Sequence, residues 1–257
     1  MKGDYETISV DVTDRIGTVT LDRSDEMNAL NKRSFRELSD AFETFDEMER
    51  SGDLGVVTVR GSGGNFSAGF DLSEVPSWED QTPREIWMEF VSFHDAYRRI
   101  EQLSVPVIAA VNGYCLAAGL ELAISCDFIV AKDDAVFAFP ESQKGLAMDF
   151  GGAQKLPGII GESNAMYLIL TAESIDAELA HMWGLVQEVV DGESFEERIV
   201  ELQETLASYP TYALGFNKDE VLSTRPDNID EAMKVGIAYA VAVAKEERTQ
   251  ALVREFL

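Results

Sequence analysis

One apolar stretch constrains the fold of this 257-residue chain more than any other feature. It runs from Val105 to Ala131, and four residues interrupt it: Pro106, Asn112, Glu121 and Asp127. It therefore never reaches the roughly 18 unbroken apolar residues that a membrane span requires. Its residue pattern predicts a buried strand over Val105–Val111, a turn at Asn112-Gly113 and a short helix over Ala118–Ser125.

Strand and helix patterns alternate on both sides of this stretch. Residues 8–12 and 18–21 predict a hairpin around Arg15-Ile16-Gly17. Asn31 is expected to cap a helix that ends at Gly52, and residues 56–59 form a short buried strand. A helix over residues 83–103 and a strand over residues 128–131 continue the pattern. Such repetition of strand, loop and helix predicts an α/β fold with parallel strand pairing.

The chain turns helical after about residue 193. Helices are expected over Phe195–Leu206, Thr211–Leu222 and Ile229–Lys245, with Pro210 and Pro226 between them. We therefore expect an α/β core over residues 1–195 and a C-terminal helical oligomerisation region over residues 196–257.

The charge balance excludes some partners. The chain has 47 acidic and 21 basic residues, a formal net charge of -26. Nucleic acid and anionic membranes are not expected as partners, because binding to them needs a basic face. The excess charge is spread along the sequence, which is typical of a strongly solvated surface, and we hypothesise a protein from a high-salt cytoplasm. Residues 1–6 lack the apolar run of a signal peptide, so a soluble cytoplasmic protein is predicted.

The cysteines and histidines form no metal or nucleophile motif. Cys115 and Cys126 lie in apolar segments outside any C-x-x-C pattern, so we expect reduced core thiols and no metal site. His94 and His181 have no motif partner and are expected on helix surfaces.

Glu121 is the only charged residue between Val105 and Cys126. A carboxylate in such surroundings is rarely buried without a partner. Burial would raise its pKa toward the range that acid–base catalysis at neutral pH requires. Glu121 is therefore a candidate catalytic residue, and the alternative is a carboxylate that reaches solvent at a helix edge.

Ala118 strengthens the catalytic hypothesis. It lies in the first turn of the expected helix, so its N–H has no partner within that helix. Glu121 follows three residues later on the same face. One helical turn thus presents an amide donor beside a carboxylate, which is half of an oxyanion hole with an acid–base group next to it.

The loop after the strand at residues 56–59 offers the other half. Its small residues Ser67-Ala68-Gly69 would let a ligand approach the backbone closely, and Asp71 is expected to cap the segment that follows. A dinucleotide-binding loop is not indicated, because Phe66 stands where the third glycine of that motif belongs.

Two further carboxylates lie in apolar surroundings. Glu141 closes the aromatic segment 137–140, and Asp149 precedes Phe150-Gly151-Gly152. Asp149 has two interpretations, the cap of a helix that starts near Gly151 or a catalytic group. Together with backbone donors, these carboxylates predict proton transfer on a polarised carbonyl and leave the substrate open.

Several segments together resemble the crotonase superfamily, the enoyl-CoA hydratases and isomerases. The resemblance covers about residues 5–250. It rests on residues 28–30 after Arg23, the oxyanion-type segments 66–72 and 112–122, the Pro140-Glu141 segment with residues 145–156, and Trp183-Gly184-Leu185-Val186.

The resemblance implies a crotonase-like α/β spiral of ββα units with a C-terminal helical trimerisation region, as a homotrimer or dimer of trimers. It implies that the Ala68 and Ala118 N–H groups bind the thioester oxygen of an acyl-CoA. Glu121 and Glu141 match the two glutamates of a hydratase of fatty acid metabolism, and coenzyme A enters as part of the substrate. Substrate contacts are implied at Arg23, Met27, Ala29, Ser67, Gly69, Phe70, Asp71, Leu72, Tyr114 and Leu116.

Two departures from the family pattern leave alternatives open. Met148-Asp149 stands where many hydratases have Pro-Gly, and it resembles dienoyl-CoA isomerases, in which Glu141 and Asp149 would shuttle protons. Those isomerases, however, carry Asp where this chain has Glu121. Asp25-Glu26 replaces a lysine that relatives often carry, which leaves these candidate cations for the coenzyme A phosphates: Arg23, Lys144 and Lys245.

A different class of function is a non-catalytic relative that binds acyl-CoA and uses the trimer as a scaffold. The retention of Glu121 and Glu141 argues against it, because a scaffold needs no carboxylates in apolar surroundings.

Overall fold

The structure of the chain is a computed structural model that describes residues 5–224 and 229–257. Pro226 and residues 1–4, which belong to the segment used above to exclude a signal peptide, lie outside the described residues. Among the described residues, no helix combines the length and the apolar character needed to cross a bilayer.

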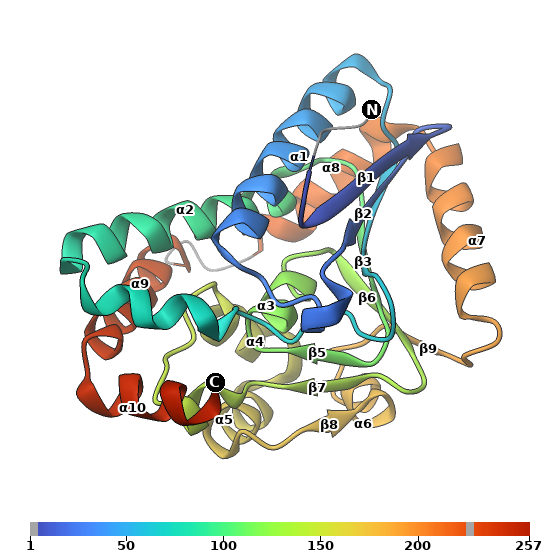
Figure 1. Cartoon of the computed structure of the whole chain (residues 1–257). Coiled ribbons are helices and arrows are strands. Elements are labelled where there is room, and N and C mark those ends of the chain that lie inside the picture. Colours follow the sequence, from blue (N-terminus) through green and yellow to red (C-terminus); the bar gives the residue numbers. More distant parts are fainter. Residues whose placement is uncertain (1–4, 225–228) are drawn as a thin grey trace.

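Within residues 5–224 and 229–257, six strands form the main sheet, in the order β1-β2-β3-β4-β6-β9 (Figure 1). The strands are β1 (Ile8–Thr13), β2 (Ile16–Leu21), β3 (Val56–Gly61), β4 (Val107–Val111), β6 (Phe128–Lys132) and β9 (Glu188–Val190). The predicted hairpin is confirmed: β1 and β2 pair antiparallel, with Ile8 opposite Leu21. All other neighbours in this sheet pair in parallel, as the strand–loop–helix repetition predicts.

Helices cover both faces of this sheet (Figure 1). Helices α1 (Lys32–Ser51) and α2 (Pro83–Gln102) pack on one face, and α7 (Phe195–Ser208) packs on the other. Alternate residues of β3 divide between the two sides: Val57 and Val59 join the cluster of α1 and α2, and Val56 joins that of α7. This period of two is what a strand buried on both faces requires.

Local signals set the ends of the first helix. The Asn31 side chain accepts hydrogen bonds from the N–H groups of Arg33 and Ser34, as expected of an N-cap. Gly52 ends α1 with a φ of 82°, a left-handed conformation that costs glycine little.

A second sheet runs crosswise below the first in Figure 1. It consists of β5 (Tyr114–Leu116), β7 (Val136–Ala138) and β8 (Ile175–Asp176). The helix α3 (Ala118–Ala123) follows β5, and the 3₁₀ segment η3 (Pro140–Lys144) follows β7. These strands are too short to leave an alternating pattern, so the sequence did not predict them.

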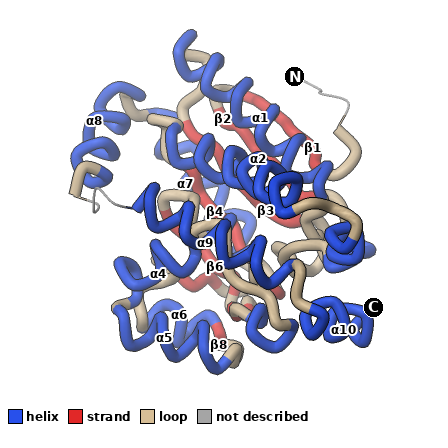
Figure 2. The backbone as a smooth tube through the Cα atoms, turned by 90° about the vertical axis from the view of Figure 1, so that its left-hand side faces the viewer, coloured by secondary structure: helices blue, strands red, loops and turns tan. Residues whose placement is uncertain are grey.

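Along the chain, the other helical elements of the described residues lie between and after these strands. They are η1 (Ser24–Glu26), η2 (Leu72–Glu79), α4 (Gly152–Ile160), α5 (Glu162–Thr171), α6 (Ala177–Met182), α8 (Thr211–Leu222), α9 (Ile229–Ala244) and α10 (Glu247–Phe256). Helix α9 packs against both α2 and α4 (Figure 2). The division of the chain at residue 195 stays a prediction.

Two expectations about single residues have opposite outcomes. His181 is exposed on α6, as predicted, but the prediction for His94 is wrong, because its side chain is buried. The reason is that His94 lies on the inward face of α2, where its ring packs against that of Phe150 at a centroid distance of 5.7 Å. Cys115 and Cys126 are free and buried, as expected.

Candidate active site

A cavity of about 450 Å³ opens between α3, η3, the loop after β3 and the C-terminal helices. Most of the site residues predicted from the sequence line it: Met27, Ala29, Ala68, Phe70, Asp71, Leu72, Leu116, Ala118, Glu121, Glu141 and Asp149. Four predicted substrate contacts are not among the lining residues: Arg23, Ser67, Gly69 and Tyr114.

These four residues have other contacts. Arg23 forms an ion pair of 2.9 Å with Asp71, which does line the cavity. Ser67 is fully buried, and its hydroxyl donates to the carbonyl of Asn28 over 2.8 Å. Gly69 allows a close approach of the backbone, described below, and the Tyr114 side chain is 47% exposed. Arg23 and Ser67 thus contact residues in or next to the cavity wall without lining the cavity themselves.

The backbone around Ala118 is held in a specific orientation. Ala117 has a φ of 50° and a ψ of -129°, an uncommon conformation that turns the chain sharply into α3. The Ala117 N–H donates to the carbonyl of Ala138, and the Tyr97 hydroxyl donates to the Ala118 carbonyl over 2.8 Å. Within the described residues, the Ala118 N–H donates to no other group, as expected for the first turn of a helix.

The prediction for Ala68 needs a correction. The Ala68 N–H donates to the Met27 carbonyl over 2.9 Å, so this amide is already engaged. Gly69 has a φ of 97°, which reverses the regular alternation of the extended chain at this point. The donor on this side of the cavity is a residue that the sequence reasoning placed among substrate contacts, Phe70.

The orientation of the Phe70 amide follows from a β-bridge with Leu30. The Leu30 N–H donates to the Gly69 carbonyl over 2.7 Å, and the Leu30 carbonyl accepts from the Asp71 N–H over 2.9 Å. In such a parallel bridge the central residue, here Phe70, points its own N–H away from its partner. Within the described residues, the Phe70 N–H donates to no protein group.

Phe70 and Ala118 come from segments in close contact. A Cβ atom added to Gly69 would lie 3.2 Å from the Ala118 nitrogen and 2.9 Å from the Leu116 carbonyl oxygen. A Cβ added to Gly119 would lie 2.6 Å from that of Ser67. Glycine at both positions therefore lets the two backbones meet, and two unengaged amides line one cavity. The sequence motif located this segment, but it could not identify which amide is free.

Glu121 is buried to 1% exposure and is held by two backbone amides. Its Oε1 atom accepts hydrogen bonds from the N–H groups of Gly152, over 2.8 Å, and Phe150, over 3.1 Å. Burial raises the pKa of Glu121 to about 7, and the Gly152 amide and the nearby Lys155 charge oppose that rise. The alternative of a solvated carboxylate at a helix edge is wrong.

Glu141 lies across the cavity on η3. Its side chain is half-buried, but its Oε2 atom is sealed from solvent and has no hydrogen-bond partner among the described residues. Burial and the charge of Glu121 raise the pKa of Glu141 to about 8. Its own backbone amide opposes this rise in pKa, whereas two amides of another segment favour the ionised form of Glu121.

Asp149 does not cap a helix. The N-cap position of α4 is Gly151, with no side-chain capping bond, and the buried Oδ2 atom of Asp149 has no partner among the described residues. Burial and the charges of Glu121 and Glu141 raise the pKa of Asp149 well above its usual value. Because the charges of these carboxyl groups repel one another, ionisation of one favours the protonated form of the others, and the cavity can hold a proton donor and a proton acceptor together.

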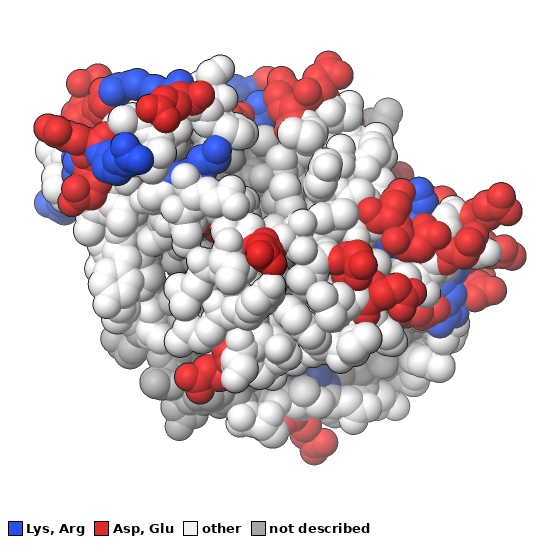
Figure 3. All heavy atoms as spheres, turned by 90° about the horizontal axis from the view of Figure 1, so that it is seen from below, with Lys and Arg blue, Asp and Glu red and all other residues white. Residues whose placement is uncertain are grey.

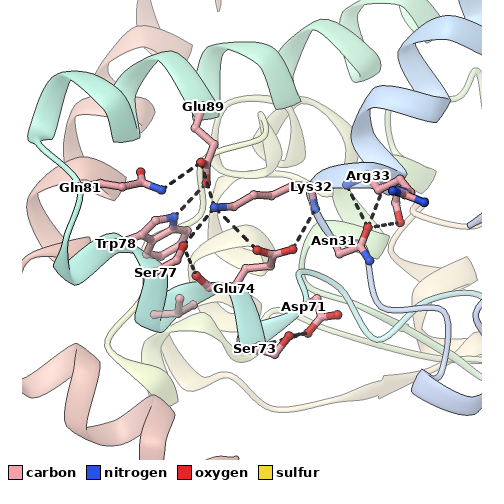
Figure 4. Close-up of polar contacts among 12 residues, drawn as sticks. Asn31, Lys32, Arg33, Asp71, Ser73, Glu74, Ser77, Trp78, Gln81 and Glu89 are labelled. Atoms are coloured by element: carbon pink, nitrogen blue, oxygen red, sulfur yellow. Dashed lines mark hydrogen bonds and ion pairs between the residues drawn. The ribbon is translucent and has the colours of Figure 1, made fainter.

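Aromatic rings form the wall of the cavity. Phe70 stacks on Trp78 at a centroid distance of 5.5 Å, and Trp78 packs on Phe90 at 5.2 Å. The Trp78 indole N–H donates to Glu89, which also forms an ion pair of 3.0 Å with Lys32 (Figure 4). These contacts join η2 to α1 and α2.

Polar contacts at both ends extend this anchoring of η2. As predicted, Asp71 caps η2 by accepting from the Ser73 N–H over 3.1 Å (Figure 4). The ammonium group of Lys245 donates to the carbonyls of Trp78 and Glu79. Lys144 is the one of the three candidate cations that lines the cavity, where it lies 3.7 Å from the Phe256 ring centroid.

The chain has two sheets, and its C-terminal helices lie beside a cavity lined by the backbone segments of Phe70 and Ala118. This architecture defines an α/β protein of the crotonase fold. Residues 11–256 match the model of the enoyl-CoA hydratase/isomerase family, and the chain belongs to that family. This membership confirms the resemblance found in the sequence.

Individual relatives carry different activities. A probable enoyl-CoA hydratase of Mycobacterium leprae is 38% identical over 72% of this chain and 69% of its own length. A 1,2-epoxyphenylacetyl-CoA isomerase of Escherichia coli is 32% identical over 86% of this chain and 84% of its own. The solved structure of an enoyl-CoA hydratase from Mycobacterium avium subsp. paratuberculosis has a TM-score of 0.88 at 25% identity and covers 98% of this chain and 99% of its own.

Proposed function

We propose that the protein is an enoyl-CoA hydratase, which adds water across the 2,3 double bond of a 2-enoyl-CoA thioester. The observation that carries this proposal is the meeting of four groups at one cavity: the unengaged amides of Phe70 and Ala118 and the carboxyl groups of Glu121 and Glu141. Such a set combines an oxyanion hole with an acid and a base.

In the proposed reaction, the thioester oxygen accepts hydrogen bonds from the Phe70 and Ala118 amides. These amides stabilise the negative charge that builds on that oxygen as the enolate forms, and losing one such donor typically costs about 3 kcal/mol of barrier stabilisation. Glu121, ionised with the help of two amides, takes a proton from water as its oxygen attacks the β-carbon. Glu141, protonated, donates its proton to the α-carbon.

The rest of the acyl-CoA has candidate contacts around the cavity. The aromatic wall suits the acyl group, and Met27 and Ala29 line the side on which the resemblance implies the coenzyme A contact. Lys144 is the candidate cation for its phosphates, since Arg23 is paired with Asp71. The reaction needs no cofactor besides the coenzyme A of the substrate.

Incubation with crotonyl-CoA tests the proposal. Hydration would remove the absorbance of the conjugated thioester and yield a 3-hydroxyacyl-CoA. Absence of this loss at micromolar enzyme, with the double bonds of a 3,5-dienoyl-CoA shifting instead, would replace the hydratase with the isomerase described next.

A dienoyl-CoA isomerase is the second candidate, and Asp149 is the observation that favours it. Its buried carboxyl group lines the cavity with an unpartnered oxygen, which a proton shuttle with Glu141 would use. Asp149→Asn distinguishes the two reactions, since it should abolish isomerisation of a 3,5-dienoyl-CoA if Asp149 carries the proton. Binding of coenzyme A without turnover of either substrate would instead favour a non-catalytic scaffold.

We also propose that the chain forms a homotrimer or a dimer of trimers. Despite the net charge of -26, the face seen in Figure 3 is largely uncharged over the side where α5 and α6 lie. Large apolar residues are exposed on these two helices: Met166, Tyr167, Leu170 and Met182. Analytical ultracentrifugation tests this proposal, and a sedimentation coefficient of a 28.4 kDa monomer at micromolar concentration would contradict it.

The acidic composition supports a proposal about the environment. A cytoplasm rich in salt would screen the self-repulsion of such a surface, because the Debye length falls to about 3 Å at 1 M. The melting temperature should therefore rise with KCl concentration. Equal melting temperatures at 0.1 and 2 M KCl would exclude this adaptation.

A further inference from the structure

Lys155 is a buried cation that the proposed mechanism does not use. Its side chain is 4% exposed, and its Nζ atom lies 3.0 Å from Glu101 Oε1 and 3.0 Å from Ser125 Oγ. Burial of an ammonium group is costly, and the N-terminal end of a helix, here that of α4, disfavours positive charge. The lysine therefore depends on nearby negative groups for its stability.

Lys155 connects the two segments that fix Glu121. The Ser125 hydroxyl that faces the lysine donates to the Glu121 carbonyl over 2.8 Å, at the end of α3. On the other side, a Cβ atom added to Gly151 would lie 3.0 Å from Lys155 Cε, so the lysine packs over the turn that presents the Gly152 amide. That amide binds the Glu121 carboxylate.

On the basis of the proposed function, we propose that Lys155 is a positioning residue that keeps Glu121 in its ionised, proton-accepting form while Glu141 remains the proton donor. The positive charge of Lys155 acts on Glu121, where it favours the carboxylate over the carboxylic acid. The positive charge thus separates the roles of two glutamates that share one cavity.

The other groups around Glu121 do not supply this charge. The titratable and charged groups that face Glu121 or Lys155 are His94, Tyr97 and Glu101 from α2, Cys126 after α3, Glu141 from η3, and Asp149. Burial and the Lys155 charge lower the pKa of His94 to about 4, so this imidazole is neutral at pH 7. Among the described residues named here, Lys155 is the one that carries a positive charge.

The test is the pH dependence of kcat/KM on crotonyl-CoA for Lys155→Gln, which keeps hydrogen-bonding capacity and removes the charge. We expect the acidic limb of this profile to move up by about one pH unit. At pH 6, kcat/KM should then fall about tenfold relative to the native protein, whereas at pH 8.5 it should stay near normal. Lys155→Arg should restore the limb. The control is Lys218→Gln, which removes a cation that pairs with Asp127 over 2.8 Å, and it should leave the limb in place.

A second measurement does not depend on turnover. In protein labelled with ¹³C-glutamate, with the Glu121 resonance assigned from Glu121→Gln, the titration midpoint of Glu121 should rise in Lys155→Gln. If the native protein turns over no enoyl thioester while this midpoint moves, the proposed function fails and the role of Lys155 in ionisation stands.

Two outcomes would overturn the inference. One is a loss of activity by the same factor at every pH, with an unmoved limb and an unmoved Glu121 midpoint, which would make Lys155 a purely structural residue. If Lys155→Gln does not fold, Lys155→Met serves instead, because it keeps the length of the buried side chain and removes the charge. An acidic limb that stays in place in folded Lys155→Met is the second such outcome.

Discussion

The two sides of the cavity are built from different chemistry. On one side, Phe70 and Ala118 offer backbone amides whose directions are set by a β-bridge and by the unusual φ of Ala117. On the other side, Glu121 and Glu141 offer side-chain carboxyl groups whose protonation is set by burial and by mutual repulsion. The amide side has a fixed dipole at every pH, whereas the carboxyl side changes with pH.

The two kinds of group differ in how they respond to pH and to substitution. Backbone donors cannot be titrated and can be removed only by changing the chain itself, so they suit the stabilisation of a developing charge. Carboxyl groups with raised pKa values exchange protons near neutral pH, so they suit acid–base transfer. Substitutions on the two sides should therefore differ in their pH dependence as well as in their size.

The largest effect is expected on the carboxyl side. Glu141→Gln removes the proposed proton donor and should lower kcat/KM on crotonyl-CoA by about 10³-fold, within the range for a general acid. The matched control is Glu162→Gln, which removes an exposed glutamate on α5 and should leave kcat/KM unchanged. A loss below tenfold in folded Glu141→Gln would assign the proton to another group.

The next effect tests the amide side. Ala118→Pro deletes one N–H at the first position of α3, where proline is tolerated in helices, and should lower kcat by about 10²- to 10³-fold at every pH. Ala118→Gly keeps the amide and serves as the control. Similar kcat values for the two variants, both shown to be folded by circular dichroism, would remove Ala118 from the oxyanion hole.

A smaller effect is expected where the two sides are joined. A Cβ at position 152 would lie 2.8 Å from Glu121 Oε1 and 2.4 Å from Met148 Cε. Gly152→Ala should therefore displace Glu121, reduce kcat/KM by about tenfold or more and destabilise the fold by about 1–3 kcal/mol. Gly158→Ala, on the same helix with nothing within 4 Å, is the control and should not be destabilised in urea.

The smallest effect is a dependence of stability on pH. Because the folded-state pKa values of Glu121 and Glu141 are raised from 4.5 to about 7 and 8, the native state binds more protons than the unfolded state across that window. The free energy of unfolding should consequently fall as the pH rises from about 4.5 to 8. Glu141→Gln should weaken this fall and exceed the native protein in stability at pH 8.5 by on the order of 2 kcal/mol. Urea titrations at pH 5.5 and 8.5 measure the free energy of unfolding of both proteins. An equal fall in the native protein and in Glu141→Gln would contradict the prediction.

The sequence determined those features that depend on neighbours along the chain. The hairpin of β1 and β2, the cap at Asn31 and the end of α1 at Gly52 follow from side-chain hydrogen bonds and backbone sterics within a few residues. The apolar surroundings of Glu121 made it a candidate but left a solvated carboxylate open, whereas the motifs located both backbone segments of the cavity. The short strands of the second sheet left no pattern, because each has at most three residues.

The tertiary structure alone decided which amide is free and which polar residues are enclosed. Phe70 replaces Ala68 as the proposed oxyanion donor because Met27 and Leu30, about 40 residues earlier in the chain, take up hydrogen bonds on one side of the segment. His94 is buried because Phe150, from a distant part of the sequence, packs against its ring, and Asp149 faces the cavity because Gly151 begins α4 without it. Local chemistry fixes the shape of a segment, whereas the direction and protonation of its polar groups depend on whatever the fold packs against them.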